Sequence, residues 1–236
     1  MLLKKLIAVS VPSIIARSPD TLKVFFYNIF YKRVFDLLLA IPILILLSPV
    51  LAVTAVLVYI QLGRPVLFKQ IRPGLHEKPF ELLKFRTMTD ARGDHGKLLP
   101  DTERLTSLGA FLRKTSIDEL PELINVIKGD MSLVGPRPLL LEYLPYYTQR
   151  ERLRHTVRPG ITGLSQIHGR NYLPWDDRLE MDVQYVENIS IFLDIKIILQ
   201  TLIQVLKRQD VEVVPGVVGP PLSTYRQKMN EKHLVD

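Results

Sequence analysis

Apolar residues are distributed very unevenly along the chain, and one run dominates the pattern. Residues 34–60, VFDLLLAIPILILLSPVLAVTAVLVYI, form the only apolar run on the scale of a lipid bilayer. As a continuous helix this run would reach about 40 Å, whereas the hydrocarbon core of a bilayer is about 30 Å thick. The pattern therefore predicts a membrane helix, and a tilted spanning helix is its simplest form.

Two features favour a helix that bends instead of spanning. Pro42 and Ser48-Pro49 lie inside the run, and an interior proline removes a backbone hydrogen bond and kinks a helix. Ser48 can bond to a carbonyl that the kink frees, which makes the bend tolerable in lipid. Basic residues, which mark the cytoplasmic side of a membrane, flank both ends of the run at Lys32, Arg33, Arg64, Lys69, Arg72 and Lys84. We therefore predict a re-entrant helix over residues 32–62, broken at Ser48-Pro49.

The rest of the chain alternates between short strand-like and helical patterns. Strands are predicted within residues 63–74 and 79–88, a polar loop over 89–101, and helices over 105–114, 175–188 and 190–208. The last helix is strongly apolar, but Asp194 and Lys196 argue against a second membrane span. It should lie at the membrane interface or cover the core of the domain, and both alternatives stay open.

Composition narrows the chemistry that the chain can perform. The formal net charge of +7 at pH 7 favours acidic partners, such as anionic lipid, nucleic acid or phosphorylated substrates. The absence of cysteine excludes a disulfide scaffold, a thiol mechanism and a zinc–thiolate site. The basic residues flank the apolar run and the acids without the interleaved aromatics of a base-stacking surface. A membrane-tethered nucleic-acid binder and a noncatalytic scaffold are therefore the weaker alternatives to an enzyme.

Residues 113–138, RKTSIDELPELINVIKGDMSLVGPRP, concentrate the reactive groups of the chain. Arg113 and Lys114 precede the adjacent carboxylates Asp118 and Glu119, and Arg137 closes the stretch. Carboxylates among basic side chains suit phosphate chemistry with a divalent metal, because Mg²⁺ is held by one or two carboxylates together with substrate phosphates.

Helix capping is the alternative explanation of the acid pair. Ser116 and Glu119 fit a capping box, but a helix that begins there needs a backbone donor at Pro121. A helix that begins at Asp118 places Pro121 in the first turn, where its missing N–H is harmless. Asp118 would then be an N-cap residue, and spacing alone does not choose between a cap and a reactive group.

Two proline-containing turns present further basic side chains. Gly135-Pro136-Arg137-Pro138 holds one guanidinium on a rigid turn, which suits bidentate phosphate binding, although a plain surface turn is the commoner meaning. Residues 158–163, RPGITG, likewise place a basic side chain on a rigid backbone. Polar groups of the kind that bind a nucleotide or sugar follow at Gln166, His168, Gly169, Arg170 and Asn171.

These stretches together resemble the bacterial sugar transferases, specifically the small monotopic phosphoglycosyl transferases (the PglC-like group). The resemblance covers about residues 30–208, and the first 30 residues and the tail after Arg208 lie outside it. It rests on Lys32-Arg33 with Asp36, Ser48-Pro49, Arg72-Pro73-Gly74, Lys84 to Met88, Asp118 to Pro121, Asn125-Val126, Lys128 to Ser132, Val134 to Pro138 and Arg158 to Gly163.

The resemblance implies the transfer of a sugar-1-phosphate from a UDP-sugar to polyprenyl (undecaprenyl) phosphate, with release of UMP through a covalent aspartyl intermediate. This reaction is the first membrane-committed step of glycoconjugate biosynthesis, on the cytoplasmic face of the bacterial inner membrane. The expected partners are the UDP-sugar, the polyprenyl phosphate and the membrane, and no nucleic acid is expected. Whether the chain forms a homodimer stays open.

The same resemblance assigns the site residues. Asp118 is the expected nucleophile, and Glu119 is expected to assist the polyprenyl phosphate or to help hold the metal. Both acids are expected ligands of Mg²⁺, the expected cofactor, and Arg137 is expected to bind phosphate. The weaker candidates for substrate or phosphate binding are Lys84, Arg86, Arg113, Arg158, Gln166, His168 and Arg170.

One stretch departs from the family pattern. Ser165 and His168 stand where a small apolar residue and an asparagine are expected. Because the change spares the acid pair, it bears on sugar preference and not on the reaction. Overall similarity favours an N-acetylated amino or deoxyamino sugar.

As a whole, the sequence predicts an α+β protein with four regions. These are an N-terminal amphipathic extension (1–31), the re-entrant membrane helix (32–62), a small, mostly helical cytoplasmic catalytic domain with interfacial amphipathic helices (63–208), and a C-terminal tail (209–236). A secretory signal is the alternative for the first region, but Pro12 interrupts its apolar part and Arg17 follows soon after. The proline-containing tail is expected to be extended.

Overall fold

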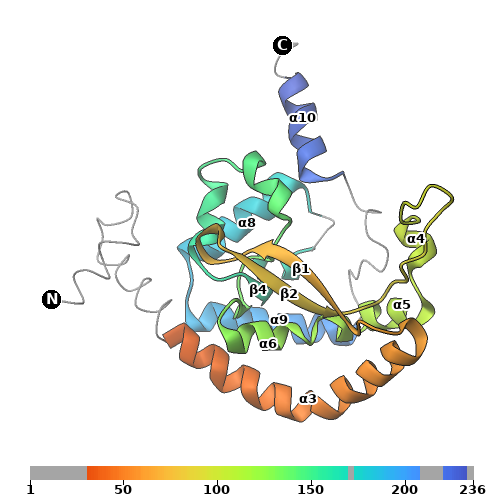
Figure 1. The fold of residues 1–236 in the computed structure, drawn as a ribbon. Coiled ribbons are helices and arrows are strands. Elements are labelled where there is room, and N and C mark those ends of the chain that lie inside the picture. Colours follow the sequence, from red (N-terminus) through yellow and green to blue (C-terminus); the bar gives the residue numbers. More distant parts are fainter. Residues whose placement is uncertain (1–30, 170–172, 208–219, 233–236) are drawn as a thin grey trace.

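The computed structural model describes residues 31–169, 173–207 and 220–232, and has a long curved helix beneath a domain of short helices and strands (Figure 1). The strands form two separate two-stranded sheets. The mixed helix and strand architecture with one long apolar helix is therefore as predicted. Apart from Tyr31, the predicted N-terminal extension lies outside the described residues.

The long helix α3 (Lys32–Leu62) is formed by the apolar run. Within the described part of the chain it is the one helix long and apolar enough to cross a membrane. The predicted break at Ser48-Pro49 is wrong, because helical turns continue through Pro42 and Pro49 and the helix curves instead of breaking (Figure 1). The Ser48 hydroxyl donates to the Ile45 carbonyl at 2.7 Å, which provides a bond near the site where Pro49 has no N–H to donate.

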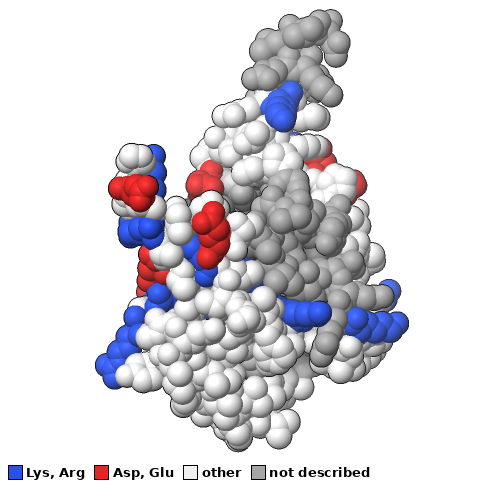
Figure 2. Space-filling view, turned by 90° about the vertical axis from the view of Figure 1, so that its right-hand side faces the viewer, with Lys and Arg blue, Asp and Glu red and all other residues white. Residues whose placement is uncertain are grey.

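One side of α3 packs against the domain and the other side is uncovered. Ala40 joins the main core cluster, whereas Val58 joins a second cluster under the first strands. The lower surface in Figure 2, on the side of α3, shows no charged residues. The exposed large apolar residues on α3 include Leu38, Ile41, Ile45, Leu46, Val53, Val56 and Ile60. An uncovered apolar surface of this length suits lipid and not water.

A buried ion pair ties the start of α3 to the domain. Lys32 Nζ lies 2.7 Å from Asp194 Oδ2 on helix α9 (Ile191–Lys207), and both side chains are almost fully buried. Tyr185 Oη lies 2.7 Å from the other Asp194 oxygen. Because buried charges are stable only when they are paired, this contact fixes where α3 meets the domain.

Two neighbouring side chains strengthen the same junction. The Arg33 guanidinium donates to the carbonyls of Val126 and Ile127, the latter at 2.7 Å, near the end of helix α6 (Glu122–Lys128). Asp36 accepts hydrogen bonds from the Ser132 hydroxyl at 3.0 Å and from the Leu133 N–H at 3.1 Å. The first turns of α3 are therefore bonded to α6, to α9 and to the strand that begins at Ser132.

The first sheet is an antiparallel hairpin of β1 (Leu67–Pro73) and β2 (Pro79–Phe85), joined through the short turn η2 (Leu75–Glu77). Asn125 of α6 fastens this hairpin to the core. Its side chain accepts from the Leu83 N–H at 3.1 Å and donates to the Glu81 carbonyl at 2.7 Å. The second sheet pairs β3 (Ser132–Val134) with β4 (Gly160–Thr162) in parallel.

The predicted helices are present with small changes at their ends. The helix expected over 105–114 begins at Ser107, because Thr106 caps it by accepting from the Gly109 N–H. The remaining elements are α4 (Asp101–Arg104), α5 (Ser107–Lys114), η3 (Ile117–Glu119), η4 (Leu141–Tyr146), η5 (Glu151–Thr156), α7 (Leu164–Ile167), α8 (Trp175–Glu187) and α10 (Leu222–Lys232).

Helix α9 combines both alternatives that the sequence left open. Its Asp194 and Ile197 are fully buried against the domain, whereas Phe192 and Leu206 are each 82% exposed. The helix therefore covers the core with one side and presents an apolar surface with the other. This second side is the part that suits a membrane interface.

The prediction of an extended tail is wrong for its described part, since residues 222–232 form α10. Pro220 and Pro221 precede the helix instead of interrupting it, and the Pro221 carbonyl accepts the first helical bond from the Tyr225 N–H at 2.9 Å. Proline is tolerated at this position because the first N–H groups of a helix have no partner within it.

Replacing Asp194 with alanine should destabilise the detergent-solubilised protein by about 3–5 kcal/mol, because Lys32 would stay buried without its counter-charge. Thermal unfolding followed by circular dichroism measures this loss. The matched control is Glu81→Ala, which breaks the exposed Lys69–Glu81 pair at 2.8 Å and should cost less than about 1 kcal/mol. Equal effects of the two changes would contradict a structural role for the buried pair.

Candidate active site

The two adjacent acids lie on a single turn before α6 and do not cap it. Asp118 and Glu119 belong to the short turn η3, and α6 begins only at Glu122, after Pro121 at its N-cap. Ser116 has a left-handed backbone, and neither it nor Pro121 makes a side-chain capping bond. The predicted helix start at Asp118 is therefore wrong, and so is the capping explanation of the acid pair.

Glu119 is held by two cations from distant parts of the chain. Lys84 Nζ of β2 and Arg137 Nη2 of the Gly-Pro-Arg-Pro turn each lie 2.5 Å from Glu119 Oε1. Burial raises the pKa of Glu119, but the charges of Arg137 and Lys84 outweigh burial and hold this pKa well below its usual range. Glu119 is therefore ionised and fixes both cations in place.

Asp118 has the opposite electrostatic character. Its side chain is buried, with the residue 7% exposed. Burial and the neighbouring charge of Glu119 raise the pKa of Asp118 to about 6, although Lys84, Arg113 and Arg137 act in the other direction. Adjacent carboxyl groups whose environments push their pKa values apart are typical of acid–base and nucleophilic sites.

A third carboxylate, Glu122, completes the cluster, and the sequence analysis did not assign it. It is only 1% exposed and lies 3.4 Å from Lys84 Nζ. Burial raises the pKa of Glu122 to about 7, with Lys84 opposing the rise and Glu119 adding to it. The signal for Glu122 was its position one turn after Asp118, next to the proline that precedes α6.

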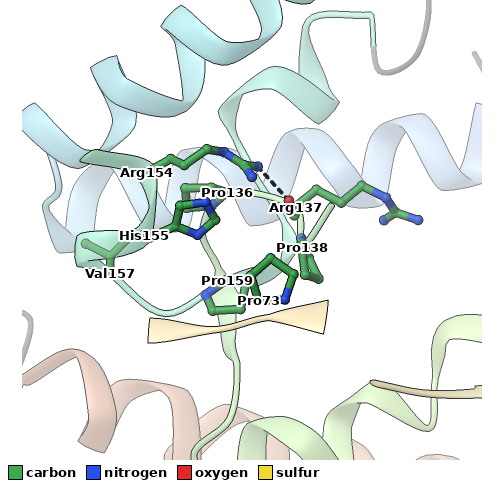
Figure 3. Close-up of a pocket in the computed structure, with 8 residues that line it drawn as sticks. All are labelled: Pro73, Pro136, Arg137, Pro138, Arg154, His155, Val157 and Pro159. Carbon is green, nitrogen blue, oxygen red and sulfur yellow. Dashed lines mark hydrogen bonds between the residues drawn. The ribbon is translucent and has the colours of Figure 1, made fainter. Parts of the chain in front are cut away.

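The backbone of Arg137 is supported from the side opposite its guanidinium. Figure 3 shows the Arg137 carbonyl facing Arg154, while the Arg137 side chain extends away from the surrounding prolines. Arg154 Nη2 donates to this carbonyl at 2.6 Å and also pairs with Asp182 at 2.8 Å, where both side chains are buried. The Ser165 hydroxyl donates to the second Asp182 oxygen at 2.8 Å. Ser165, expected to bear on sugar preference, is therefore a buried support of Arg137.

Three glycines allow the backbones of the two proline-containing turns to pack directly against each other. The Gly135 N–H donates to the Thr162 carbonyl at 2.8 Å, and the Gly160 N–H donates to the Pro136 carbonyl at 3.0 Å. A Cβ at Gly135, Gly160 or Gly163 would come closer than 3.0 Å to backbone atoms of the opposite turn. Only glycine fits where two backbones approach so closely.

The weaker arginine candidates occupy three different places. Arg113 donates to the Thr87 hydroxyl at 3.1 Å. Its charge lowers the pKa of Asp118 and so opposes the effect of burial, which means that Arg113 acts on the acid pair. Arg86 donates to the Leu62 carbonyl at 3.0 Å, at the end of α3. Arg158 donates to the Gly129 carbonyl at 2.9 Å, at the end of α6. Arg86 and Arg158 therefore bind backbone carbonyls at the ends of α3 and α6.

The polar residues that follow β4 make local contacts. The Gln166 amide donates to the Ile161 carbonyl at 2.9 Å. The His168 ring, with Nδ1 2.9 Å from the Leu164 carbonyl oxygen, is exposed. Arg170 lies outside the described residues. Neither Gln166 nor His168 is brought to the acid pair by these contacts.

A cavity of about 290 Å³ opens beside Lys84 and Arg137. Arg72 of β1, a second residue without an assigned role in the sequence analysis, lines it. Arg72 Nε is buried without a hydrogen-bond partner, and burial together with the charge of Arg137 lowers the pKa of Arg72 to about 10. The other lining residues are Leu82, Glu122, Pro138, Leu139, Leu140, Tyr143 and Trp175. The cavity thus combines cations, one carboxylate and an apolar and aromatic wall.

Comparison with known proteins identifies the family of the chain. Residues 27–208 match the profile of the bacterial sugar transferase family. An uncharacterized sugar transferase, EpsL of Bacillus subtilis, is 55% identical over 77% of this chain and 90% of its own length. The exopolysaccharide production protein ExoY of Rhizobium meliloti is 39% identical over 72% of this chain and 83% of its own length.

A third relative is longer than this chain. The UDP-glucose:undecaprenyl-phosphate glucose-1-phosphate transferase of Klebsiella pneumoniae is 42% identical over 74% of this chain. The match covers 40% of that relative's own length. The similarity therefore concerns one part of the Klebsiella protein.

The Asp118 carboxyl should titrate near pH 6, and replacing Glu119 with glutamine should lower its pKa. The change removes a negative neighbour and leaves Lys84 and Arg137 to act on Asp118. A ¹³C NMR titration of protein labelled at its aspartate carboxyl carbons measures this, with the Asp118 signal assigned by its loss in Asp118→Asn. Glu81→Gln, at an exposed position of β2, is the control and should leave the titration unchanged. An unchanged midpoint in Glu119→Gln would mean that burial alone sets the pKa of Asp118.

Proposed function

The chain belongs to the bacterial sugar transferase family, and from this premise we propose that it transfers a sugar-1-phosphate from a UDP-sugar to polyprenyl phosphate. The observation that carries the proposal is the acid pair, in which Asp118 and Glu119 have opposite pKa shifts beside Lys84 and Arg137. The printed name of the Klebsiella relative describes a reaction of this class with glucose-1-phosphate and undecaprenyl phosphate.

In the first step, an oxygen of the Asp118 carboxylate attacks the phosphorus that bears the sugar. The bond from this phosphorus to the bridging oxygen breaks, UMP leaves with that oxygen, and Asp118 carries the sugar phosphate as a mixed anhydride. A pKa of about 6 supports this role, because the carboxylate is ionised at neutral pH and is more basic than an ordinary aspartate.

Lys84 and Arg137 would bind the phosphate oxygens during this attack. Glu119 holds both cations at 2.5 Å before any substrate arrives, so they need not reorganise as charge builds up at the phosphorus. Preorganised cations of this kind stabilise the transition state of phosphoryl transfer. Arg154 and Asp182 serve the same end by fixing the backbone of Arg137.

In the second step, an oxygen of the polyprenyl phosphate attacks the same phosphorus. The bond to Asp118 breaks, its carboxylate is restored, and polyprenyl diphosphate-sugar is the product. The two half-reactions use one phosphate position in turn, which agrees with a single cluster of cations around Asp118.

The donor set at the acid pair fits Mg²⁺ bound jointly with substrate. Within the described residues, no group of three or more His, Asp or Glu side chains is placed to hold a metal ion. In this proposal Asp118 and Glu119 would supply the protein ligands, and phosphate and water oxygens the remainder, which is the usual arrangement for this ion. A bound Mg²⁺ supplies neutralisation of the phosphate charge.

We also propose that α3 is re-entrant, because both of its ends are bonded to the same domain. Lys32 pairs with Asp194 of α9 at one end, and the Leu62 carbonyl accepts from Arg86 after β2 at the other. A helix that crossed the bilayer would carry one of these ends to the opposite side. The basic residues at both ends favour the cytoplasmic face, and the bend would hold the active site at the membrane surface.

The sugar of the donor is the remaining part of the proposal. The resemblance of the sequence favours an N-acetylated amino or deoxyamino sugar, whereas the Klebsiella relative is named for glucose. Both kinds of UDP-sugar therefore belong in the panel of donors that tests the reaction.

Replacing Asp118 with asparagine should abolish formation of the covalent intermediate while the protein still folds. The measurement is intact mass after incubation with Mg²⁺ and the panel of UDP-sugars, without lipid acceptor. The unmodified chain should gain a sugar phosphate that maps to Asp118 and is lost when polyprenyl phosphate is added. Asp90→Asn, at an exposed carboxylate, is the matched control and should still form the adduct. Full turnover by the Asp118→Asn variant would remove Asp118 as the nucleophile.

Single cysteines at Tyr31 and Arg64 should both react from the cytoplasmic side of the membrane, since the chain has no cysteine of its own. A membrane-impermeant maleimide should label both positions in inside-out vesicles and neither in intact spheroplasts. A cysteine at Leu46, at the exposed apolar surface of α3, should react only after detergent is added. Labelling of the two end positions from opposite sides would establish a spanning helix.

A further inference from the structure

One wall of the cavity beside the acid pair is supported by residues outside the family's domain. The family match ends at residue 208, whereas the segment from Pro220 to Arg226 packs against this wall. Leu222 is fully buried in one cluster with Leu139 and Tyr143, and both of these residues line the cavity. The C-terminal segment therefore forms a second layer behind the wall.

The same segment holds Trp175, the largest side chain of the wall. The Trp175 indole N–H donates to the Pro220 carbonyl at 2.9 Å. The Tyr143 ring meets the Trp175 ring edge-on, with centroids 5.6 Å apart, and the Arg178 guanidinium lies 4.9 Å from its centroid. These three contacts fix the plane of the indole without involving the acid pair.

Two further bonds attach the C-terminal segment beside Trp175. The Tyr225 hydroxyl donates to Asp176 at 2.6 Å, and Arg226 pairs with Asp176 at 2.7 Å. Arg226 also pairs with Glu151 of η5. Since Asp176 directly follows Trp175 in the first turn of α8, these bonds hold the backbone that carries the indole.

We propose that the cavity receives the sugar of the donor, with Trp175 as its stacking wall, and that the segment 220–226 takes part in sugar selection by positioning Trp175. This inference rests on the proposed function and assigns a subsite within it. Trp175 would contact the sugar, whereas Leu222 and Tyr225 are positioning residues that act through Trp175.

The location of the cavity favours the sugar of the donor, and not its nucleoside, as the group that occupies the cavity. Lys84 and Arg137 line the cavity and also hold Glu119 beside Asp118. The phosphate attacked by Asp118 carries the sugar directly, whereas the uridine is one phosphate further away. The group that lies next to these cations is therefore the sugar.

The size and lining of the cavity agree with a single sugar ring. Its volume of about 290 Å³ is at the lower end of the roughly 300–1,000 Å³ found for small-molecule sites, which suits one ring and not a whole nucleotide sugar. The apolar face of a pyranose can pack on Trp175. The Glu122 carboxylate and the Arg72 guanidinium offer an acceptor and a donor for its hydroxyl or amide groups.

The test is steady-state kinetics of the full chain with a UDP-sugar that the unmodified protein uses, with UDP as a competitive inhibitor. Trp175→Ala should raise the KM for the UDP-sugar by about three- to tenfold, the range expected for loss of one aromatic contact. The kcat and the inhibition constant of UDP should stay within about twofold, and Trp175→Phe should restore most of the KM.

The positioning residues need variants of their own. Leu222→Ala should raise the KM in the same direction, and Tyr225→Phe, which removes the bond to Asp176 without opening a cavity, should do so more weakly. Both variants should also change the ranking of donors in a UDP-sugar panel. The control is Arg150→Ala, which breaks exposed ion pairs with Glu180 and Glu187 on α8 and should change none of these quantities.

Several outcomes would overturn the inference. Equal rises in the KM and in the UDP inhibition constant would place the nucleotide in the cavity. Unchanged KM and donor ranking in Trp175→Ala would show that the donor does not use the cavity. If Leu222→Ala and Tyr225→Phe lowered the melting temperature and the kcat but left the KM unchanged, the segment 220–226 would have a purely structural role. Failure of the proposed function itself is distinct, because the unmodified protein would then form no adduct and release no UMP.

Discussion

The candidate site depends on one partly buried carboxylate, Glu119, and on the two cations that it holds. Lys84 comes from the hairpin and Arg137 from a turn between the second pair of strands, and both end 2.5 Å from the same oxygen. Charges taken out of water are destabilising unless they are paired with good geometry, so these three elements cannot separate independently. The pairing also leaves Asp118 as the more basic acid, with positive charge around it and a negative neighbour beside it. The same ion cluster therefore links these elements and pushes the pKa values of the two adjacent acids apart.

The junction between α3 and the domain gives this cluster a fixed position relative to the long apolar helix. Lys32 and Asp36 are buried polar groups at the start of an otherwise apolar helix, and each has its partner in the domain. At the far end, Arg86 binds the last carbonyl of the helix and lies two residues after Lys84. Helix α3 and the site are thus connected through a few bonds at each end of the helix.

The sequence predicts the parts of this structure that depend on local patterns. The apolar run, the two strands of the hairpin, the acid pair and Arg137 follow from periodicity, turn residues and motif spacing. Glu122 and Arg72 were not assigned roles, because the burial of an isolated charged residue depends on tertiary packing that spacing does not report. The family resemblance makes Arg158 a candidate, and the polar groups after residue 163 make Gln166 one, yet both side chains donate to backbone carbonyls. The helix α10 was missed because the prolines that indicated an extended tail only precede it.

The glycine contacts between the two proline-containing turns limit how this protein can be altered. Gly135, Gly160 and Gly163 bring two backbones so close that neither turn has room for a side chain at the crossing. A chimera that took the Arg137 turn from one relative and the β4 turn from another would have to preserve the crossing atom by atom. The two turns are therefore a single module for protein engineering, and neither can be exchanged without the other.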